Sequence, residues 1–173
     1  CTLCYNVMNG DISSNGYVGG GVVVGNNGGI VECCYNAMNC GISGGYVGGL
    51  VGYNQGRVEN CYNAMNGDIS GNNYVGGLVG TNYGSISNCY NAMIGSISGS
   101  YYVGGLVGYN QGRVANCYNA MIGVISGNYF VGGCVGLTYS RISYYSCSTS
   151  GSSSRHAVYA VVEAVYTSYL FIH

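Results

Sequence analysis

A chain of 173 residues is long enough for a domain with a core, but its composition excludes several classes of protein. Charged residues make up 5% of it, lysine is absent and the formal net charge is −1, so no basic patch is available for nucleic acid or an anionic membrane surface. Its 33 glycines lack the three-residue period of collagen, and an apolar fraction of 48% argues against a disordered chain.

Residues 1–143 form a tandem repeat. The string Cys-Tyr-Asn begins at residues 4, 34, 61, 89 and 117, in steps of 30, 27, 28 and 28. The string Tyr-Val-Gly-Gly begins at residues 17, 46, 74 and 102, and Phe-Val-Gly-Gly begins at residue 130. A near-constant period of this length is typical of proteins in which each unit stacks on the preceding one.

Each unit is expected to contain two or three short strands. Glycine recurs every few residues and disfavours a helix, whereas the short runs of Val, Ile and Tyr between the glycines favour strands. Gly and Asn mark the corners. A constant unit length favours flat coils over hairpins, because a coil must close at a fixed length to stack. The prediction is an all-β parallel β-solenoid (β-helix) of about five 28-residue coils, spaced by about 4.8 Å.

Stacking in register would place equivalent residues in ladders along the solenoid axis. Three aliphatic ladders are expected inside: Ile12, Ile42, Ile69, Ile97 and Ile125; Val58, Ile86, Val114 and Ile142; and Leu50, Leu78, Leu106 and Cys134. An amide ladder at a corner would bond along the axis, as in cross-β stacks: Asn36, Asn63, Asn91 and Asn119. Beside it we expect a tyrosine ladder (Tyr35, Tyr62, Tyr90 and Tyr118) and a methionine ladder (Met38, Met65, Met93 and Met121).

The units resemble the GLUG-motif repeats of bacterial surface proteins. The residues that carry the resemblance are Tyr46–Asn54, Tyr74–Asn82 and Tyr102–Asn110, each followed by Cys-Tyr-Asn. Such repeats occur in large adhesin-like proteins and beside IgA-specific metallopeptidases. The resemblance implies an extracellular or cell-surface location. It implies no peptidase activity, because the chain lacks a His-Glu-x-x-His motif.

After Arg141 the repeat pattern fails. Residues 144–155 are interpreted as a Ser-rich linker, and residues 156–173 as an apolar C-terminal segment. At 18 residues this segment is short for a transmembrane helix, which needs about 20, so no membrane span is predicted. A cap over the last coil, a segment that docks onto another subunit and a membrane or sorting element are the three alternatives.

Ten cysteines allow disulfides or a metal site. The recurring cysteines are interpreted as small buried hydrophobes: Cys34, Cys61, Cys89 and Cys117. Four others break the ladder and are the candidates for disulfides: Cys33, Cys40, Cys134 and Cys147. Cys1 and Cys4 form a Cys-x-x-Cys pair without a nearby second pair or histidine, so no metal is predicted. Cys1 is alternatively the lipidated terminus of a mature lipoprotein.

No catalytic residues and no cofactor are predicted. Asp11 and Asp68 occupy equivalent repeat positions and are interpreted as solvated turn residues, not as a catalytic pair. The only histidines are His156 and His173, in the C-terminal segment. Without lysine there is no phosphate-binding loop.

The leading functional hypothesis is a structural protein that assembles with itself into an extracellular fibre or surface layer by stacking of solenoid units. It rests on the scarcity of charge, on the abundance of Tyr and Gly, and on a first unit without a polar cap before Cys4. The alternative is an adhesive or glycan-binding stalk of a larger surface protein, with exposed Tyr and Asn ladders as the binding face. The expected partners are copies of the same chain or glycans.

Overall fold

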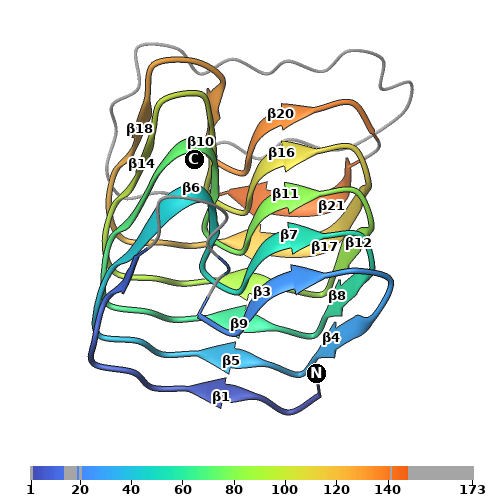
Figure 1. The fold of residues 1–173 in the computed structure, drawn as a ribbon. Helices are drawn as coiled ribbons and strands as arrows, with labels where there is room; N and C mark the ends of the chain where they lie inside the picture. Colours follow the sequence, from blue (N-terminus) through green and yellow to red (C-terminus); the bar gives the residue numbers. More distant parts are fainter. Residues whose placement is uncertain (1, 14–18, 20, 141, 148–173) are drawn as a thin grey trace.

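The computed structural model describes residues 2–13, 19, 21–140 and 142–147. Successive turns of the chain lie on one another as the coils of a solenoid (Figure 1). Within the described residues all paired strands are parallel, and none of these residues is helical. The predicted all-β parallel β-solenoid with a spacing of about 28 residues is therefore confirmed.

The described strands form three sheets. The first sheet contains β1 (Tyr5–Asn6), β4 (Ile30–Glu32), β5 (Tyr35–Asn36), β8 (Arg57–Glu59), β9 (Tyr62–Asn63), β12 (Ser85–Ser87), β13 (Tyr90–Asn91), β17 (Arg113–Asn119) and β21 (Ile142–Cys147). The second contains β2 (Ile12–Ser13), β6 (Ile42–Gly48), β10 (Ile69–Gly76), β14 (Ile97–Gly99), β15 (Tyr102–Gly104), β18 (Ile125–Gly127) and β19 (Val131–Gly132). The third contains β3 (Val23–Asn26), β7 (Val51–Asn54), β11 (Val79–Asn82), β16 (Val107–Asn110) and β20 (Val135–Thr138).

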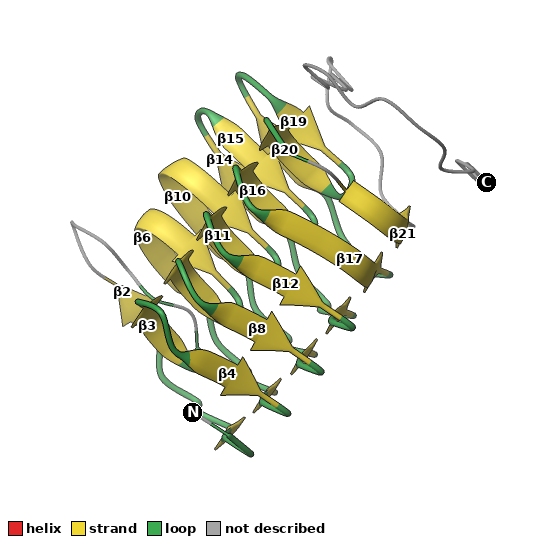
Figure 2. Ribbon diagram, turned by 90° about the vertical axis from the view of Figure 1, so that its right-hand side faces the viewer, coloured by secondary structure: helices red, strands yellow, loops and turns green. Residues whose placement is uncertain are grey.

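One coil passes through all three sheets in turn. The coil that starts at Cys61 runs through β9, arches over in β10, continues in β11 and returns to the first sheet in β12. Figure 2 shows the returning strands β4, β8, β12, β17 and β21 following one another along the stack. Each coil therefore contacts mainly the coils before and after it, which is the construction of a solenoid.

Like residues are paired with like residues throughout. Ile69 lies opposite both Ile42 and Ile97, and Ile86 lies opposite Val58 and Val114. One step between successive repeats is 27 residues, one shorter than the usual 28. The difference appears as a register shift between Gly71 and Tyr74 of β10, and β10 pairs with β6 in register before and after this shift.

The interior is divided into two separate hydrophobic cores. One core, between the first and third sheets, is built from the Leu, Val and Cys ladders: Val31, Cys34, Leu50, Val51, Val58, Cys61, Leu78, Val79, Ile86, Cys89, Leu106, Val107, Val114, Cys117 and Cys134. The other fills the arch with the Met, Ile and Val ladders: Met38, Cys40, Ile42, Val47, Met65, Ile69, Val75, Met93, Ile97, Val103, Met121, Ile125 and Val131. The coil is therefore pinched at its middle.

Repeat-type pairing extends beyond residue 143, where the sequence placed the end of the repeats. In β21, Tyr145 lies in register with Cys117, and Cys147 with Asn119. The first residues of the predicted linker 144–155 thus continue the first sheet. The rest of the linker and the predicted segment 156–173 lie outside the described residues, as does Cys1.

Candidate functional site

The two cores are separated by a row of asparagines, which we call the crossbar ladder: Asn6, which is half-buried, and the buried Asn36, Asn63, Asn91 and Asn119. The side chain of Asn63 donates from Nδ2 across the coil to the carbonyl of Gly77, at 2.8 Å. The same nitrogen donates to Oδ1 of Asn91 in the next coil, at 2.9 Å. This pattern repeats in each coil. The sequence had suggested that these amides lie at a corner of the coil. In the structure they lie in its interior.

The crossbar explains why Cys-Tyr-Asn and Gly-Gly recur together. A Cβ on Gly77 would lie 2.3 Å from Nδ2 of Asn91 and 2.2 Å from the carbonyl oxygen of Gly105. The second glycine of the pair must therefore lack a side chain, so that the opposite strand can approach the amide. Buried amides need such partners, because an unpaired buried polar group costs about 1–3 kcal/mol.

A second buried amide row, the corner ladder, was not foreseen from the sequence: Asn26, Asn54, Asn82 and Asn110. Nδ2 of Asn54 donates to Oδ1 of Asn82 at 2.8 Å and to the carbonyl of Gly56 at 3.2 Å. The ladder ends where Asn110 donates to the hydroxyl of Thr138, at 3.0 Å. The signal was present, because the string Asn-x-Gly recurs every 28 residues in all four of these units.

The cysteine ladder is buried in the larger core. Cys34, Cys61, Cys89 and Cys117 are present as thiols. Each thiol donates to the carbonyl two residues earlier, at 3.1 Å in Cys61 and 3.2 Å in Cys117. Hydrogen bonds to Cys117 and Cys61, together with burial, raise the pKa of Cys89 well above its usual range. Hydrogen bonds with Cys89 act in the opposite direction on its neighbours, lowering the pKa of Cys61 to about 7 and also lowering the pKa of Cys117. All four side chains are buried in the larger core, where they pack as small hydrophobic residues.

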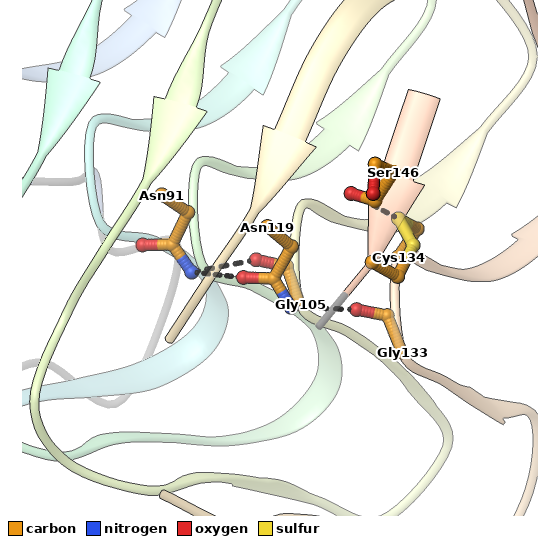
Figure 3. Close-up of a disulfide and its surroundings, with 7 residues drawn as sticks. Asn91, Gly105, Asn119, Gly133, Cys134 and Ser146 are labelled. Atoms are coloured by element: carbon orange, nitrogen blue, oxygen red, sulfur yellow. Dashed lines mark hydrogen bonds between the residues drawn. A yellow bond between two sulfur atoms is a disulfide. The ribbon is translucent and has the colours of Figure 1, made fainter. Parts of the chain in front are cut away.

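Two of the four cysteines predicted as disulfide candidates form a disulfide with each other. Cys134 and Cys147 are bonded, with 5.6 Å between their Cα atoms (Figure 3). Cys147 is paired in register with Asn119 of the preceding coil. The side-chain amide of Asn119 donates to the carbonyl of Gly133 at 2.7 Å. The disulfide therefore joins the two walls at the place where the preceding coils carry a crossbar amide.

The other two candidates were wrong. Cys33 is a free thiol at an exposed corner with a positive φ of 51°, and Leu3 and Asn60 occupy the equivalent corners of the adjacent coils, so it has no cysteine partner there. Cys40 is also a free thiol. It aligns with Gly10 and Gly67 in the adjacent coils, and its thiol donates to the carbonyl of Gly10 at 2.9 Å. Neither position brings a second sulfur within reach.

The tyrosine ladder lies on the outside of the first sheet: Tyr5, Tyr35, Tyr62, Tyr90 and Tyr118. The first four rings form a continuous stack, with centroid distances of 4.9, 5.1 and 5.2 Å and interplanar angles of 9°, 14° and 2°. Tyr118 is paired in register with Tyr90. Burial, followed by the neighbouring phenols of Tyr35 and Tyr90, raises the pKa of Tyr62.

Rings also gather over the second and third sheets, on what we call the aromatic face: Tyr46, Tyr53, Tyr74, Tyr83, Tyr101, Tyr102, Tyr109, Tyr129, Phe130 and Tyr139. Tyr74 and Tyr102 stack at 5.0 Å, and Tyr109 meets both edge-on at 5.2 and 5.5 Å. The repeat spacing in the sequence had indicated only the Tyr ladder of the first sheet.

Four of the six charged side chains in the described region make local contacts. Asp11 accepts from the backbone N–H of Gly41 at 2.8 Å, and Asp68 accepts from that of Ser96 at 2.7 Å. Arg57 forms an ion pair with Glu59 at 2.5 Å. No group of three or more His, Cys, Asp or Glu side chains suited to a metal ion occurs in the described part of the chain. His156 and His173 lie outside it.

A shallow groove crosses the arch. It has a volume of about 650 Å³ and is lined by Ser43, Gly44, Gly45, Ser70, Gly71, Asn72, Ser98 and Gly99. Its serines lie in register in adjacent coils. The groove is therefore polar and uncharged.

Parallel coils, two cores and continuous side-chain ladders define the chain as a β-solenoid repeat protein. The family described as the GLUG motif matches residues 43–70, 71–98 and 99–125. Residues 43–125 are therefore GLUG-motif repeats, as the resemblance in the sequence had indicated. Comparison with curated proteins and with solved structures finds no match. The described residues contain no helix with the length and apolarity to cross a membrane.

Proposed function

We propose that this protein is a non-catalytic structural module that associates with copies of itself into an extracellular fibre or surface layer. The observation that carries the proposal is the outer surface, which presents rows of tyrosines at coil spacing and very little charge. Among the large side chains, Tyr5 is 65% exposed and Tyr118 is 49% exposed.

Low charge favours association. Repulsion between like-charged surfaces keeps many proteins apart, and edge charges oppose unwanted pairing. In the described part of this chain Asp11 and Asp68 bond to the backbone, and Glu59 is paired with Arg57. Little charge therefore opposes contact between the aromatic rows of two copies.

The stacking geometry favours assembly over sugar binding on the tyrosine ladder. A sugar packs against the face of an aromatic ring. In Tyr35 and Tyr62 both faces are covered by neighbouring rings, at 4.9 to 5.2 Å. The ladder therefore offers ring edges and hydroxyl groups to its surroundings, which suits contact with another ladder of the same kind.

Two observations support an extracellular location. Disulfides persist in oxidising compartments and are rare in the cytosol, and Cys134 is bonded to Cys147. The resemblance to repeats of bacterial surface proteins favours the same location.

Sedimentation velocity over a range of concentrations tests the proposal, with electron microscopy of the same samples. We expect the protein to form oligomers or filaments at neutral pH. A variant with Tyr5→Glu, Tyr90→Glu and Tyr118→Glu places charges on the exposed ladder and should stay monomeric. The matched control, Val24→Glu, changes an exposed residue of β3 away from the ladder. A wild-type protein that remains monomeric at high concentration would refute the proposal.

A second candidate is an adhesive stalk that binds neutral glycans, and the groove on the arch favours it. Hydroxyl groups of Ser43, Ser70 and Ser98 recur along the groove at the spacing of the coils. An extended sugar chain could place one hydroxyl group against each of them. Binding on a glycan array that is lost in a Ser43→Val, Ser70→Val, Ser98→Val variant would support this candidate, and unchanged binding would exclude the groove.

A further inference from the structure

We propose that the tyrosine ladder is a site of oxidative cross-linking, at which exposed ladder tyrosines of two copies couple as dityrosine. The inference rests on the proposed self-association, because coupling requires the ladders of two copies to meet. It adds a covalent step that locks the assembly.

The first argument is the electronic continuity of the ladder. The rings of Tyr5, Tyr35, Tyr62 and Tyr90 are nearly parallel, at 4.9 to 5.2 Å between centroids. An electron removed from one phenol in such a stack can be replaced from the next. A radical formed anywhere in the stack can therefore reach its ends. Both ends are exposed, since Tyr5 has 65% and Tyr90 has 36% of its surface accessible.

The second argument is that coupling within one ladder is blocked. Dityrosine forms by a carbon–carbon bond between positions ortho to the two hydroxyl groups. Parallel backbone pairing holds Tyr62 and Tyr90 in register, one coil apart. Rings held as parallel plates at 5.2 Å cannot bring their ortho carbons to bonding distance without breaking that pairing. The radical is therefore directed to a ring edge on another copy.

The third argument comes from the hydroxyl groups. On the aromatic face, Tyr53 accepts a hydrogen bond from Gln55 at 2.6 Å, and Tyr109 accepts one from Gln111. Within the described residues the structure assigns no hydrogen bond to the hydroxyls of Tyr5, Tyr90 and Tyr118. Their protons can pass directly to water when the rings are oxidised.

Composition is consistent with this chemistry. Tyrosine accounts for 20 of the 173 residues, and tryptophan, which would compete as an oxidisable ring, is absent. Lysine is absent as well, so cross-links that depend on an amine side chain are not available to this chain.

The reaction balances with hydrogen peroxide as the oxidant, activated by a haem peroxidase. Two phenols each lose one electron and one proton to give phenoxyl radicals. The radicals join through their ortho carbons, and each coupled carbon returns its hydrogen to the oxygen of its own ring. The two electrons and two protons reduce one hydrogen peroxide to two molecules of water.

The test treats the whole chain with hydrogen peroxide and horseradish peroxidase. Dityrosine fluorescence, denaturing gels and mass spectrometry of cross-linked peptides report the products. We expect covalent dimers and larger species, each cross-link lighter by two hydrogens than its two peptides, with the links at Tyr5, Tyr90 or Tyr118. Replacement of all five ladder tyrosines by Phe keeps the stacked rings but removes the phenols, and should lower the yield several-fold.

The matched control is Tyr46→Phe, Tyr74→Phe, Tyr102→Phe on the aromatic face, a row that already contains Phe130. Its yield should equal that of the wild type. Links that map to Tyr83, Tyr101, Tyr129 or Tyr139, or a yield unchanged in the five-Phe variant, would overturn the inference.

Sedimentation without oxidant separates this inference from the proposed function. If the untreated protein associates but its cross-links lie outside the ladder, the inference fails and the proposed function stands. If the untreated protein is monomeric and yet links form at the ladder after oxidation, the proposed function fails and the ladder is still the coupling site.

Discussion

The ring of Tyr83 fills the place that Thr81 leaves empty on the aromatic face. Thr81 is paired in register with Tyr53 on one side and Tyr109 on the other, so the third sheet lacks one ring there. The ring of Tyr83, two residues later, lies 5.5 Å from Tyr53 and 6.2 Å from Tyr109. The exchange keeps the aromatic row continuous but buries the hydroxyl of Thr81 without a hydrogen-bond partner.

Replacing Thr81 by Val should therefore stabilise the protein. Val has nearly the same shape and removes the unpaired Oγ1, whose burial costs about 1 kcal/mol or more. Urea denaturation followed by circular dichroism would show a higher midpoint. Thr138→Val is the matched control, because the Thr138 hydroxyl accepts from Asn110 and donates to Ser140. That control should lower stability, and a Thr81→Val variant that behaves like it would contradict the assignment.

The crossbar ladder should be the polar feature most sensitive to mutation. Asn91→Ala removes the bonds to Gly105 and Asn119 and leaves buried polar groups unpaired, so we expect a loss of at least about 2 kcal/mol in the free energy of unfolding. Asn66→Ala removes a single bond to Asn39 on the exposed surface and should change stability by less than about 0.5 kcal/mol. Equal effects of the two substitutions in urea denaturation would disprove the special role of the crossbar.

Reduction of the disulfide should loosen the last described coil in preference to the others. Cys134→Ser opens a link between residues 13 apart in sequence, which typically removes roughly 2–4 kcal/mol. Hydrogen exchange read by mass spectrometry should speed up in β20 and β21 and stay slow in β10 and β11. Cys33→Ser changes a free, exposed thiol and serves as the control. Faster exchange in the first coils as well would show that the disulfide stabilises the whole solenoid.

The stacked phenols should make stability fall at alkaline pH. The pKa of Tyr62 is raised in the folded state, so the unfolded chain loses its proton first and the protonated ring favours folding. This contribution is fully present below the unfolded pKa of about 10 and is lost as pH rises from there through the higher folded pKa. The urea midpoint of the wild type should therefore stay level up to about pH 9 and decrease above it. Tyr62→Phe should decrease less, and an identical decrease would rule out Tyr62 as a source.

Periodicity was sufficient to predict the fold class and the pairing of like residues. Once coils close at a fixed length, Ile42, Ile69 and Ile97 have to meet, because a shift by one residue would turn each of them outward. The burial of the cysteine ladder follows from the same argument. These predictions needed only the repeat length and the alternation of side chains.

Contacts across the coil could not be predicted in this way. The side chain of Asn63 reaches Gly77, 14 residues later, only because the coil is narrow at this point. That narrowing depends on how the two sides of the coil pack against each other. Repeat spacing says which residues stack along the axis but not which residues face each other within a turn. The same limitation applies to the disulfide, because Cys134 and Cys147 belong to different ladders. Cys33 and Cys40 depart from the cysteine ladder in the sequence, but that departure does not indicate which residues lie next to them in the adjacent coils.

The identical register between neighbouring coils sets the rule by which this molecule can change in length. Residues 71–98 contact the preceding and following units through the same pairs, so an in-frame duplication of that block would create an interface that already exists. The free energy of unfolding would then increase by the contribution of one repeat and that of one interface between repeats. An insertion of any other size in a strand that faces a core would displace the amide rows and both cores, whereas the arch of β10 already accommodates a difference of one residue between Gly71 and Tyr74. Evolution or engineering can therefore lengthen the rod in whole turns, and shorter insertions have to be confined to loops such as the arch.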